Sequence, residues 1–174
     1  MSDASLALSR VERAWQVLDG VLDPEVPVIS VRDLGIVRDV VELDGGGLEI
    51  VVTPTYSGCP ATEVIEQSIV DALVADGLGP VRVRMQRAPA WTTDWMSEAG
   101  REKLRAYGIA PPRHLAAGEA VPMRFVRRSA VEALACPRCE SADTERIAAF
   151  GATACKALWR CRACGEPFEH FKAI

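Results

Sequence analysis

Apolar residues recur with a helical period near the N-terminus. Positions i, i+3, i+4 and i+7 are occupied by Val11, Ala14, Trp15 and Leu18, which is the spacing of one face of an amphipathic helix. Ser9 and Glu12 precede that face with the spacing of a capping box. The pattern predicts a helix that runs from Ser9 towards Gly20 and buries the face that carries Trp15.

Two segments rich in valine and isoleucine follow. They read IVRDVVEL over residues 36–43 and LEIVVTPT over residues 48–55, and the turn between them is Asp44-Gly45-Gly46-Gly47. This composition is typical of β-strands joined by a hairpin. The stretch before them, residues 22–37, contains prolines at positions 24 and 27, which exclude a continuing helix.

The next elements alternate between helix and strand patterns. A second helix is predicted over residues 60–76, with one apolar face formed by Ala61, Val64, Ile65, Ile69, Ala72 and Leu73 and a stop at Gly77. Residues 80–87 alternate strictly, with Val81, Val83 and Met85 facing inward, as in a half-buried strand. A short helix is predicted over residues 97–107, before Gly108.

The element order α-β-β-α-β and the later cysteines predict an α+β protein of two parts. The first part is a small domain, residues 1–110, with a mostly antiparallel or mixed sheet and helices on one face. A linker or docked arm follows over residues 111–132, and residues 133–174 form a four-cysteine β domain similar to a zinc ribbon.

Charge is distributed unevenly between these parts. The chain has 20 Lys and Arg against 24 Asp and Glu; residues 1–110 carry a net charge of −7 and residues 111–174 a net charge of +3. An acidic first domain argues against nucleic-acid binding, and +3 on the remainder is too small to support it. The apolar runs are too short for a membrane span and the first residues lack a leader pattern, so we expect a cytoplasmic protein.

The last forty residues contain two Cys-x-x-Cys motifs, Cys136-Pro-Arg-Cys139 and Cys161-Arg-Ala-Cys164, separated by 21 residues. Four thiolates suit the tetrahedral geometry of structural zinc, and a β-hairpin between the motifs absorbs a spacing slightly longer than usual. Metal binding would supply folding free energy on the order of 10 kcal/mol. Iron in a rubredoxin-like site and a pair of disulfides are the alternatives.

Two further residues of this region have open roles. Cys155 is either a small buried apolar residue or a residue that exchanges with or supplements the ligands. His170 is close to the second motif in sequence, but it is not needed as a ligand beside four cysteines, and we expect it at the surface.

Cys59 stands apart from these cysteines, within TYSGCPATE, where a strand ends and a helix begins. If Pro60 is the first helical residue, Cys59 is the N-cap. Its thiol would then face the positive end of the helix dipole, which lowers the pKa of a cysteine. The alternative is an inert, buried cysteine at a tight turn.

Polar residues in three short motifs accompany Cys59. Asp23 and Glu25 lie in LDPEVPV, Asp33 precedes Leu34-Gly35, and Thr55 lies four residues before the cysteine. Each carboxylate also has a plain role in turn formation. In this order, D-P-E, D-L-G-I-V and T-x-x-G-C-P resemble the family of iron–sulfur assembly factors that includes SufT. The resemblance covers residues 11–87 and implies that Cys59, Asp23, Glu25, Asp33 and Thr55 form a site that binds iron or an iron–sulfur cluster transiently.

With the segment FGATACKALWRCRACGEPFEHFK, the whole chain resembles the PaaD (also PaaJ) family of accessory subunits of bacterial phenylacetyl-CoA epoxidase systems, which act in phenylacetate catabolism. The resemblance implies a non-catalytic subunit that helps to mature the metal centres of the oxygenase and reductase components. Those components, other iron–sulfur assembly proteins and a second copy of the chain are the expected partners. A stable structural subunit that docks through its zinc ribbon is the alternative.

The sequence agrees with a non-catalytic role in the complex, because it lacks the motifs of the oxygenase and of the reductase. The chain has two histidines, His114 and His170, and no Glu-x-x-His pair, so it lacks the ligands of a di-iron oxygenase. It has no G-x-G-x-x-G motif for a nucleotide of the reductase. A thiol enzyme that uses Cys59 as nucleophile would need a base, and no local motif marks one.

Trp91 and Trp95 are expected in the core rather than in a partner-facing patch. Arg124, Arg127 and Arg128 are expected to contact the acidic first domain or an acidic partner.

Overall fold

The computed structural model describes residues 8–56, 58, 60–113 and 134–173. They form two compact units, one ending at Trp91 and one beginning at Thr92. The sequence placed the boundary at residue 110. In the structure the helix and short strand after residue 92 belong to the second unit, because that strand pairs with a strand of the cysteine-rich ribbon. None of the helices in the described residues is long and apolar enough to cross a membrane.

The first unit is built on a three-stranded mixed sheet with the order β1-β2-β3. The strands are β1 (Val37–Glu42), β2 (Leu48–Val52) and β3 (Val81–Met85). β1 and β2 pair antiparallel through the predicted hairpin, in which Gly45 and Gly46 have φ angles of +97° and +85°. β2 and β3 run parallel and are connected through α2 (Thr62–Ala75). The sequence did not determine the order of the strands and allowed a mostly antiparallel or a mixed sheet. The parallel pair makes the sheet mixed.

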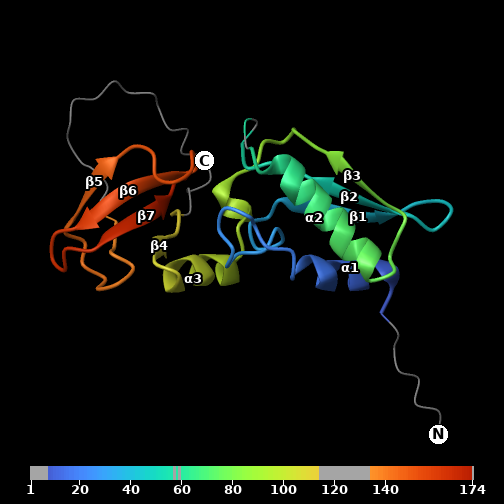
Figure 1. Cartoon of the computed structure of the whole chain (residues 1–174), viewed down its shortest axis with the longest axis horizontal. Coiled ribbons are helices and arrows are strands. Elements are labelled where there is room, and N and C mark those ends of the chain that lie inside the picture. Colours follow the sequence, from blue (N-terminus) through green and yellow to red (C-terminus); the bar gives the residue numbers. More distant parts are fainter. Residues whose placement is uncertain (1–7, 57, 59, 114–133, 174) are drawn as a thin grey trace, which may run out of the picture. The chain divides into compact units, whose positions relative to one another are not determined.

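Two helices pack against each other and on this sheet (Figure 1). α1 (Arg10–Leu18) has the predicted Ser9–Glu12 capping box and buries Ala14 and Leu18. Trp15 is half-buried and lies under the guanidinium group of Arg32, 5.3 Å from the ring centroid. α2 buries Ile65, Ile69 and Leu73 as predicted, but the expected core residue Val64 is 53% exposed.

The segment between α1 and β1 has no regular secondary structure, but backbone hydrogen bonds hold it in place. It forms an isolated bridge between Leu22 and Ser30, and the N–H of Ile36 donates to the carbonyl of Val31. The segment contributes buried apolar side chains to the core, among them Val26, Ile29 and Leu34. The indole N–H of Trp91, which is buried as predicted, donates to the carbonyl of Leu34 at 2.9 Å. The prolines therefore shape a packed loop rather than a linker.

The second unit begins with a 3-10 turn η1 (Thr93–Trp95) and α3 (Glu98–Ala106). α3 lies within the range predicted for a helix, residues 97–107, and its N-cap is Ser97. Its sheet has the order β4-β7-β6-β5. The strands are β4 (Ile109–Ala110), β5 (Thr144–Ala148), β6 (Lys156–Cys161) and β7 (Pro167–Phe171). β5 and β6 form the expected hairpin between the two cysteine motifs. Trp159, Phe168, Leu134 and two of the cysteines share its small core.

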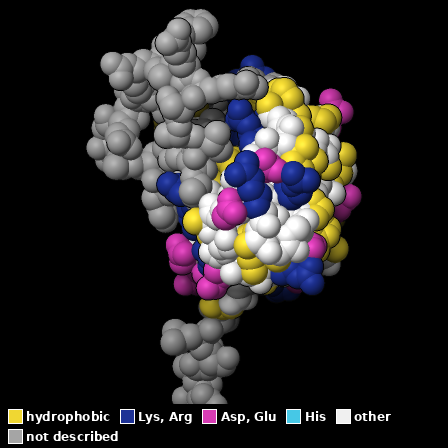
Figure 2. Space-filling view, turned by 90° about the vertical axis from the view of Figure 1, so that its left-hand side faces the viewer, with side chains coloured by type: hydrophobic (Ala, Val, Ile, Leu, Met, Phe, Trp, Pro, Cys, Tyr) yellow, Lys and Arg dark blue, Asp and Glu magenta, His cyan; other side chains and the backbone are white. Residues whose placement is uncertain are grey.

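Charged side chains of both signs lie next to one another on the face of the ribbon in Figure 2. Arg160 and Arg162 both pair with Glu145 across the β5–β6 hairpin. These pairs lower the pKa of Glu145, first through Arg162 and then through Arg160. Because basic and acidic groups lie side by side here, the described residues of this face do not form a continuous basic surface.

Candidate metal centre and the loops around Cys59

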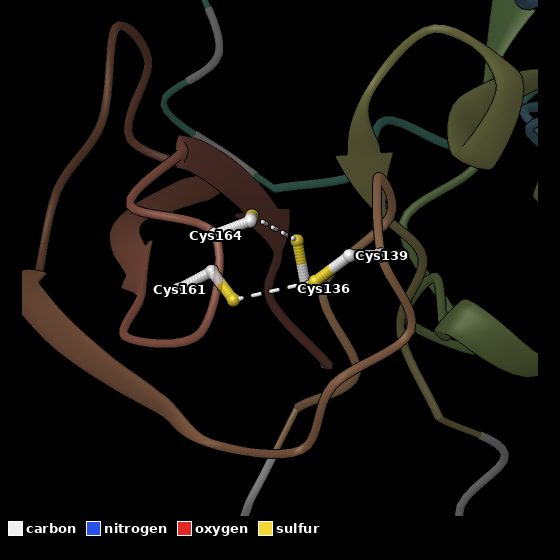
Figure 3. Close-up of side chains that lie close together, drawn as sticks. All are labelled: Cys136, Cys139, Cys161 and Cys164. Atoms are coloured by element: carbon white, nitrogen blue, oxygen red, sulfur yellow. Dashed lines mark hydrogen bonds between the residues drawn. The ribbon is translucent and has the colours of Figure 1, made fainter.

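The four predicted cysteines of the tail converge on one point (Figure 3). Their sulfur atoms all lie within 4.8 Å of one another. The Sγ–Sγ distances are 3.9 Å between Cys136 and Cys164 and 3.5 Å between Cys139 and Cys161. Four sulfurs about 2.3 Å from one tetrahedral ion would be roughly 3.8 Å apart. The donor set therefore fits a single metal ion, whereas disulfides require sulfurs about 2.05 Å apart.

The two cysteine turns have the same backbone geometry. In each, the residue after the second cysteine has a positive φ, +61° at Glu140 and +78° at Gly165. The N–H of that residue donates to the carbonyl of the first cysteine of its turn, at 2.9 Å for Glu140 and 3.0 Å for Gly165. This tight turn brings both thiols of a motif to the same side of the backbone.

The thiols of Cys161 and Cys139 have different surroundings, which lower the pKa of Cys161 and raise that of Cys139. Backbone N–H groups, first that of Cys164, lower the pKa of Cys161 to about 7. The backbone N–H of Ser141 also lowers the pKa of Cys139, but the side chains of Cys164, Cys161 and Cys136 raise it to about 12. Crowded thiols resist the build-up of several negative charges, and a bound cation compensates that charge.

The remaining candidates of this unit lie outside the sulfur group. Within the described residues, the four cysteines are the one cluster of three or more metal-ligating side chains. The Sγ of Cys155 lies 3.0 Å from the Oγ1 of Thr153 instead. His170 is half-buried rather than at the surface, with its ring edge-on to Trp159 at a centroid distance of 6.2 Å. Burial, helped by Arg113 and Lys172, lowers its pKa to about 4.

The carboxylates predicted for the first unit are partly buried and bound to the backbone. Asp23 is 9% exposed, and its Oδ1 accepts from the N–H groups of Glu25 and Val26, both at 2.8 Å. Asp33 is 8% exposed and shares a reciprocal turn with Ser30: its Oδ2 accepts from the N–H of Ser30 at 3.4 Å, and the Oγ of Ser30 accepts from the N–H of Asp33 at 3.0 Å. Both side chains therefore order the D-P-E and D-L-G loops. Glu25 and Thr55 are half-buried.

The loop that contains Cys59 connects β2 to α2. Cys59 and Ser57 lie outside the described residues. The expectation that Cys59 caps the helix is wrong, because the N-cap of α2 is Ala61 and its first helical residue is Thr62. Pro60 and Ala61 form a turn that precedes the helix. Gly58 allows a close approach, since a Cβ at this position would lie 2.9 Å from the Tyr56 ring.

A groove of about 390 Å³ lies beside this loop. It is lined by Pro54, Pro60, Thr62, Glu63, Glu66, Met85 and Arg87. These residues come from the carboxyl ends of β2 and β3 and from the first turns of α2. The carboxyl end of parallel strands is where open α/β sheets bind ligands. None of Asp23, Glu25, Asp33 and Thr55 is among its lining residues, although Pro54 and Pro60 belong to the segment between β2 and α2.

Thr53 is a polar residue that the sequence reasoning missed. It follows directly after β2, its side chain is 1% exposed, and its backbone N–H donates to the carbonyl of Ile36 at 2.9 Å. This bond joins the D-L-G-I segment to the loop that leads to Cys59. The only sequence signal was its position two residues before Thr55, near the end of the strand predicted over residues 48–55.

Comparison with known proteins agrees with both units. Residues 12–85 match the family model described as iron–sulfur cluster assembly protein, and residues 121–172 match the model of the PaaD zinc beta ribbon domain. Over 98% of both chains, the protein is 46% identical to an Escherichia coli K12 protein named as a putative 1,2-phenylacetyl-CoA epoxidase subunit. The chain belongs to the PaaD family.

Other members of the assembly-domain family resemble the first unit. A Porphyromonas gingivalis protein named Fe-S protein maturation auxiliary factor is 33% identical over 56% of this chain and 92% of its own length. The crystal structure of a domain of unknown function, DUF59, from Bacillus anthracis superposes with a TM-score of 0.51 at 25% identity. It covers 55% of this chain and 91% of the Bacillus chain. This chain thus combines a segment that matches an iron–sulfur cluster assembly family with a four-cysteine zinc-ribbon segment.

Proposed function

We propose that this protein is a non-catalytic maturation factor for the metal centres of a phenylacetyl-CoA epoxidase. Its clients are the reductase, which needs an iron–sulfur cluster, and the oxygenase, which needs a di-iron site. The observation that carries the proposal is the fusion, in one chain, of an iron–sulfur assembly domain with a PaaD ribbon. It acts in the cytoplasm, where such metabolic complexes and their assembly proteins meet.

The two units have different tasks in this proposal. Zinc, held by Cys136, Cys139, Cys161 and Cys164, supplies folding free energy to the ribbon, which recognises the epoxidase components. The first unit handles the cargo, with Cys59 as the thiolate ligand for iron or a cluster. Asp23, Glu25, Asp33 and Thr55 support the loops on either side of it.

A single cysteine cannot hold a cluster alone, so the remaining ligands come from outside the domain. Thiols of a client, of another assembly protein or of a second copy of this chain can complete the coordination. The first unit therefore binds its cargo only transiently, as transfer to a client requires.

The test is the metal content of the partners. The reductase and oxygenase are produced with and without this chain in the same host, and iron and acid-labile sulfide are measured in each. Omission should leave a partner metal-poor by severalfold, wild-type protein should restore it, and Cys59→Ser should not. Cys155→Ser is the matched control and should restore it fully. Complete metallation without this chain would contradict the proposal.

A second candidate is a stable structural subunit that docks through the ribbon. Two large apolar side chains near the β5–β6 turn favour it, since Ile147 is 53% and Phe150 66% exposed. A structural subunit purifies with the epoxidase in fixed ratio, whereas a maturation factor is absent from the active complex. Quantitative gel analysis of the purified active complex distinguishes the two.

A further inference from the structure

The second unit contains a pocket of about 500 Å³, lined by residues of α3, of β4 and the segment after it, and of the first cysteine turn. Pro111, Pro112 and Leu134 form apolar parts of its wall. Cys136, one of the four cysteines drawn in Figure 3, also lines it. Concave pockets of this size, with apolar walls and a few charged groups, are typical of sites for small molecules.

Arg101 is the buried charged residue of this pocket, with an exposed fraction of 3%. Its Nη1 donates to the carbonyl of Pro112 and its Nη2 to the carbonyl of Thr93, and its buried Nε has no hydrogen-bond partner. No carboxylate or thiol forms an ion pair or hydrogen bond with this guanidinium group. A guanidinium group stays charged in proteins, and buried charges are normally paired. The described residues therefore supply no direct counter-ion to Arg101.

Two further arginines line the same pocket. Arg105 lies four residues after Arg101, on the same face of α3, where two like charges repel each other. Arg113 is the third arginine, and the acidic lining residues are Glu98 and Glu140, so the lining carries three positive and two negative charges. Both glutamates are exposed, whereas Arg101 is buried. The pocket therefore has an excess of positive charge, and its buried charged group is basic.

We propose that this pocket binds a small organic anion, a carboxylate or a phosphate ester that carries an apolar group. Arg101 and Arg105 would bind the anionic end, because a guanidinium group offers parallel N–H donors to such oxygens. Two of the five N–H groups of Arg101 are used by backbone carbonyls, which leaves three for a ligand. Pro111, Pro112 and Leu134 would cover the apolar end.

An acidic side chain of a partner protein is the competing occupant. The pocket volume of about 500 Å³ favours the small molecule, because a single aspartate or glutamate side chain would fill only a small part of it. The site contains neither Cys59 nor any other residue of the first unit. The inference is therefore independent of the proposed maturation role.

Phenyl phosphate is a suitable probe, since it joins an anionic end to an apolar ring. Calorimetric titration of the full-length, zinc-loaded protein should show saturable binding. Phenyl phosphate should bind roughly tenfold more tightly than inorganic phosphate, because the ring buries apolar surface. Phenol, which lacks the charge, should not bind measurably. In ¹⁵N NMR spectra, the Nε–H signals of Arg101 and Arg105 should shift during the same titration.

Arg105→Gln should weaken the binding of phenyl phosphate about fivefold, the effect of losing one exposed charge contact. Arg138→Gln is the matched control. Arg138 is also exposed and also pairs with one glutamate, but it does not line the pocket. This variant should bind like wild type. Arg101→Lys keeps the charge but loses the planar group and should bind roughly tenfold more weakly. If it does not fold, Arg105→Gln still tests the site.

Three results would overturn the inference. The first is the absence of saturable binding to wild type, and the second is equal weakening by Arg105→Gln and Arg138→Gln, which would indicate non-specific attraction. The third is Arg101-dependent binding of a short acidic peptide without binding of phenyl phosphate, which would identify a protein side chain as the occupant. The titration uses this protein alone, so its outcome does not depend on whether the protein matures the epoxidase.

Discussion

Lys156 and Glu169 form an ion pair in the interior of the ribbon unit, with Nζ 2.7 Å from Oε2. The side chain of Lys156 is 5% exposed and that of Glu169 is 24% exposed. Glu169 also accepts from the N–H of Ala152 at 2.7 Å through its other oxygen, Oε1. A Cβ at Gly151 would lie 2.5 Å from that oxygen, so a side chain at this position would displace the carboxylate from its present place beside the β5–β6 turn.

Removing one partner of this ion pair should lower the stability of the ribbon substantially. Lys156→Met should destabilise the ribbon by about 2–3 kcal/mol, less than for a fully buried pair because Glu169 retains some solvent contact. Lys156→Met with Glu169→Leu should recover part of the loss. Chemical denaturation of the metal-loaded variants measures both. Equal stability of Lys156→Met and wild type would show that the pair contributes nothing.

The cysteine turns predict a stabilising substitution. Glu140 has a left-handed φ of +61°, where the equivalent residue of the second turn is Gly165. Because a side chain in this conformation costs about 1 kcal/mol, Glu140→Gly should stabilise the ribbon by about that amount. Gly165→Ala should destabilise it similarly. Thermal unfolding of the zinc-loaded protein compares them, and a loss of stability in Glu140→Gly would contradict the interpretation.

Metal removal should unfold the ribbon and leave the first unit folded. Each unit has its own core, and the ribbon core includes Cys136 and Cys161. A strong chelator at neutral pH should therefore abolish one of two calorimetric transitions. Cys136→Ser should behave like the chelated protein, whereas Cys155→Ser should keep one equivalent of metal. If both variants bind metal equally, the proposed ligand set is wrong.

The lowered pKa of His170 predicts that the ribbon loses stability in acid. Burial, followed by the charges of Arg113 and Lys172, lowers its pKa to about 4 from the ordinary 6.5. Between these values the unfolded chain binds the proton and the folded chain does not, so stability falls as pH drops from 6.5 towards 4. His170→Gln should weaken this dependence. The comparison needs wild type and variant loaded with the same metal, since thiolate protonation adds its own acid sensitivity to both. Identical pH profiles would exclude the histidine as a cause.

Local sequence determined most elements of this protein and its metal ligands. The Ser9–Glu12 capping box, the glycine turn before β2, the alternation of β3 and the Ser97 cap each specify their element through contacts within a few residues. The spacing of two Cys-x-x-Cys motifs likewise identified the four sulfurs that the fold brings together.

Tertiary structure decided what depends on partners distant in sequence. The parallel pairing of β2 with β3 and the assignment of β4 to the ribbon follow from packing between elements, which no local pattern encodes. The half-burial of His170 and the unpaired hydroxyl of Thr53 follow in the same way. The start of α2 at Thr62, with Ala61 rather than Cys59 as N-cap, shows the limit of propensity, since proline favours a first helical turn without requiring one. Covalent neighbours fix which residues are available, and only the folded chain fixes which of them are buried, paired or left without a partner.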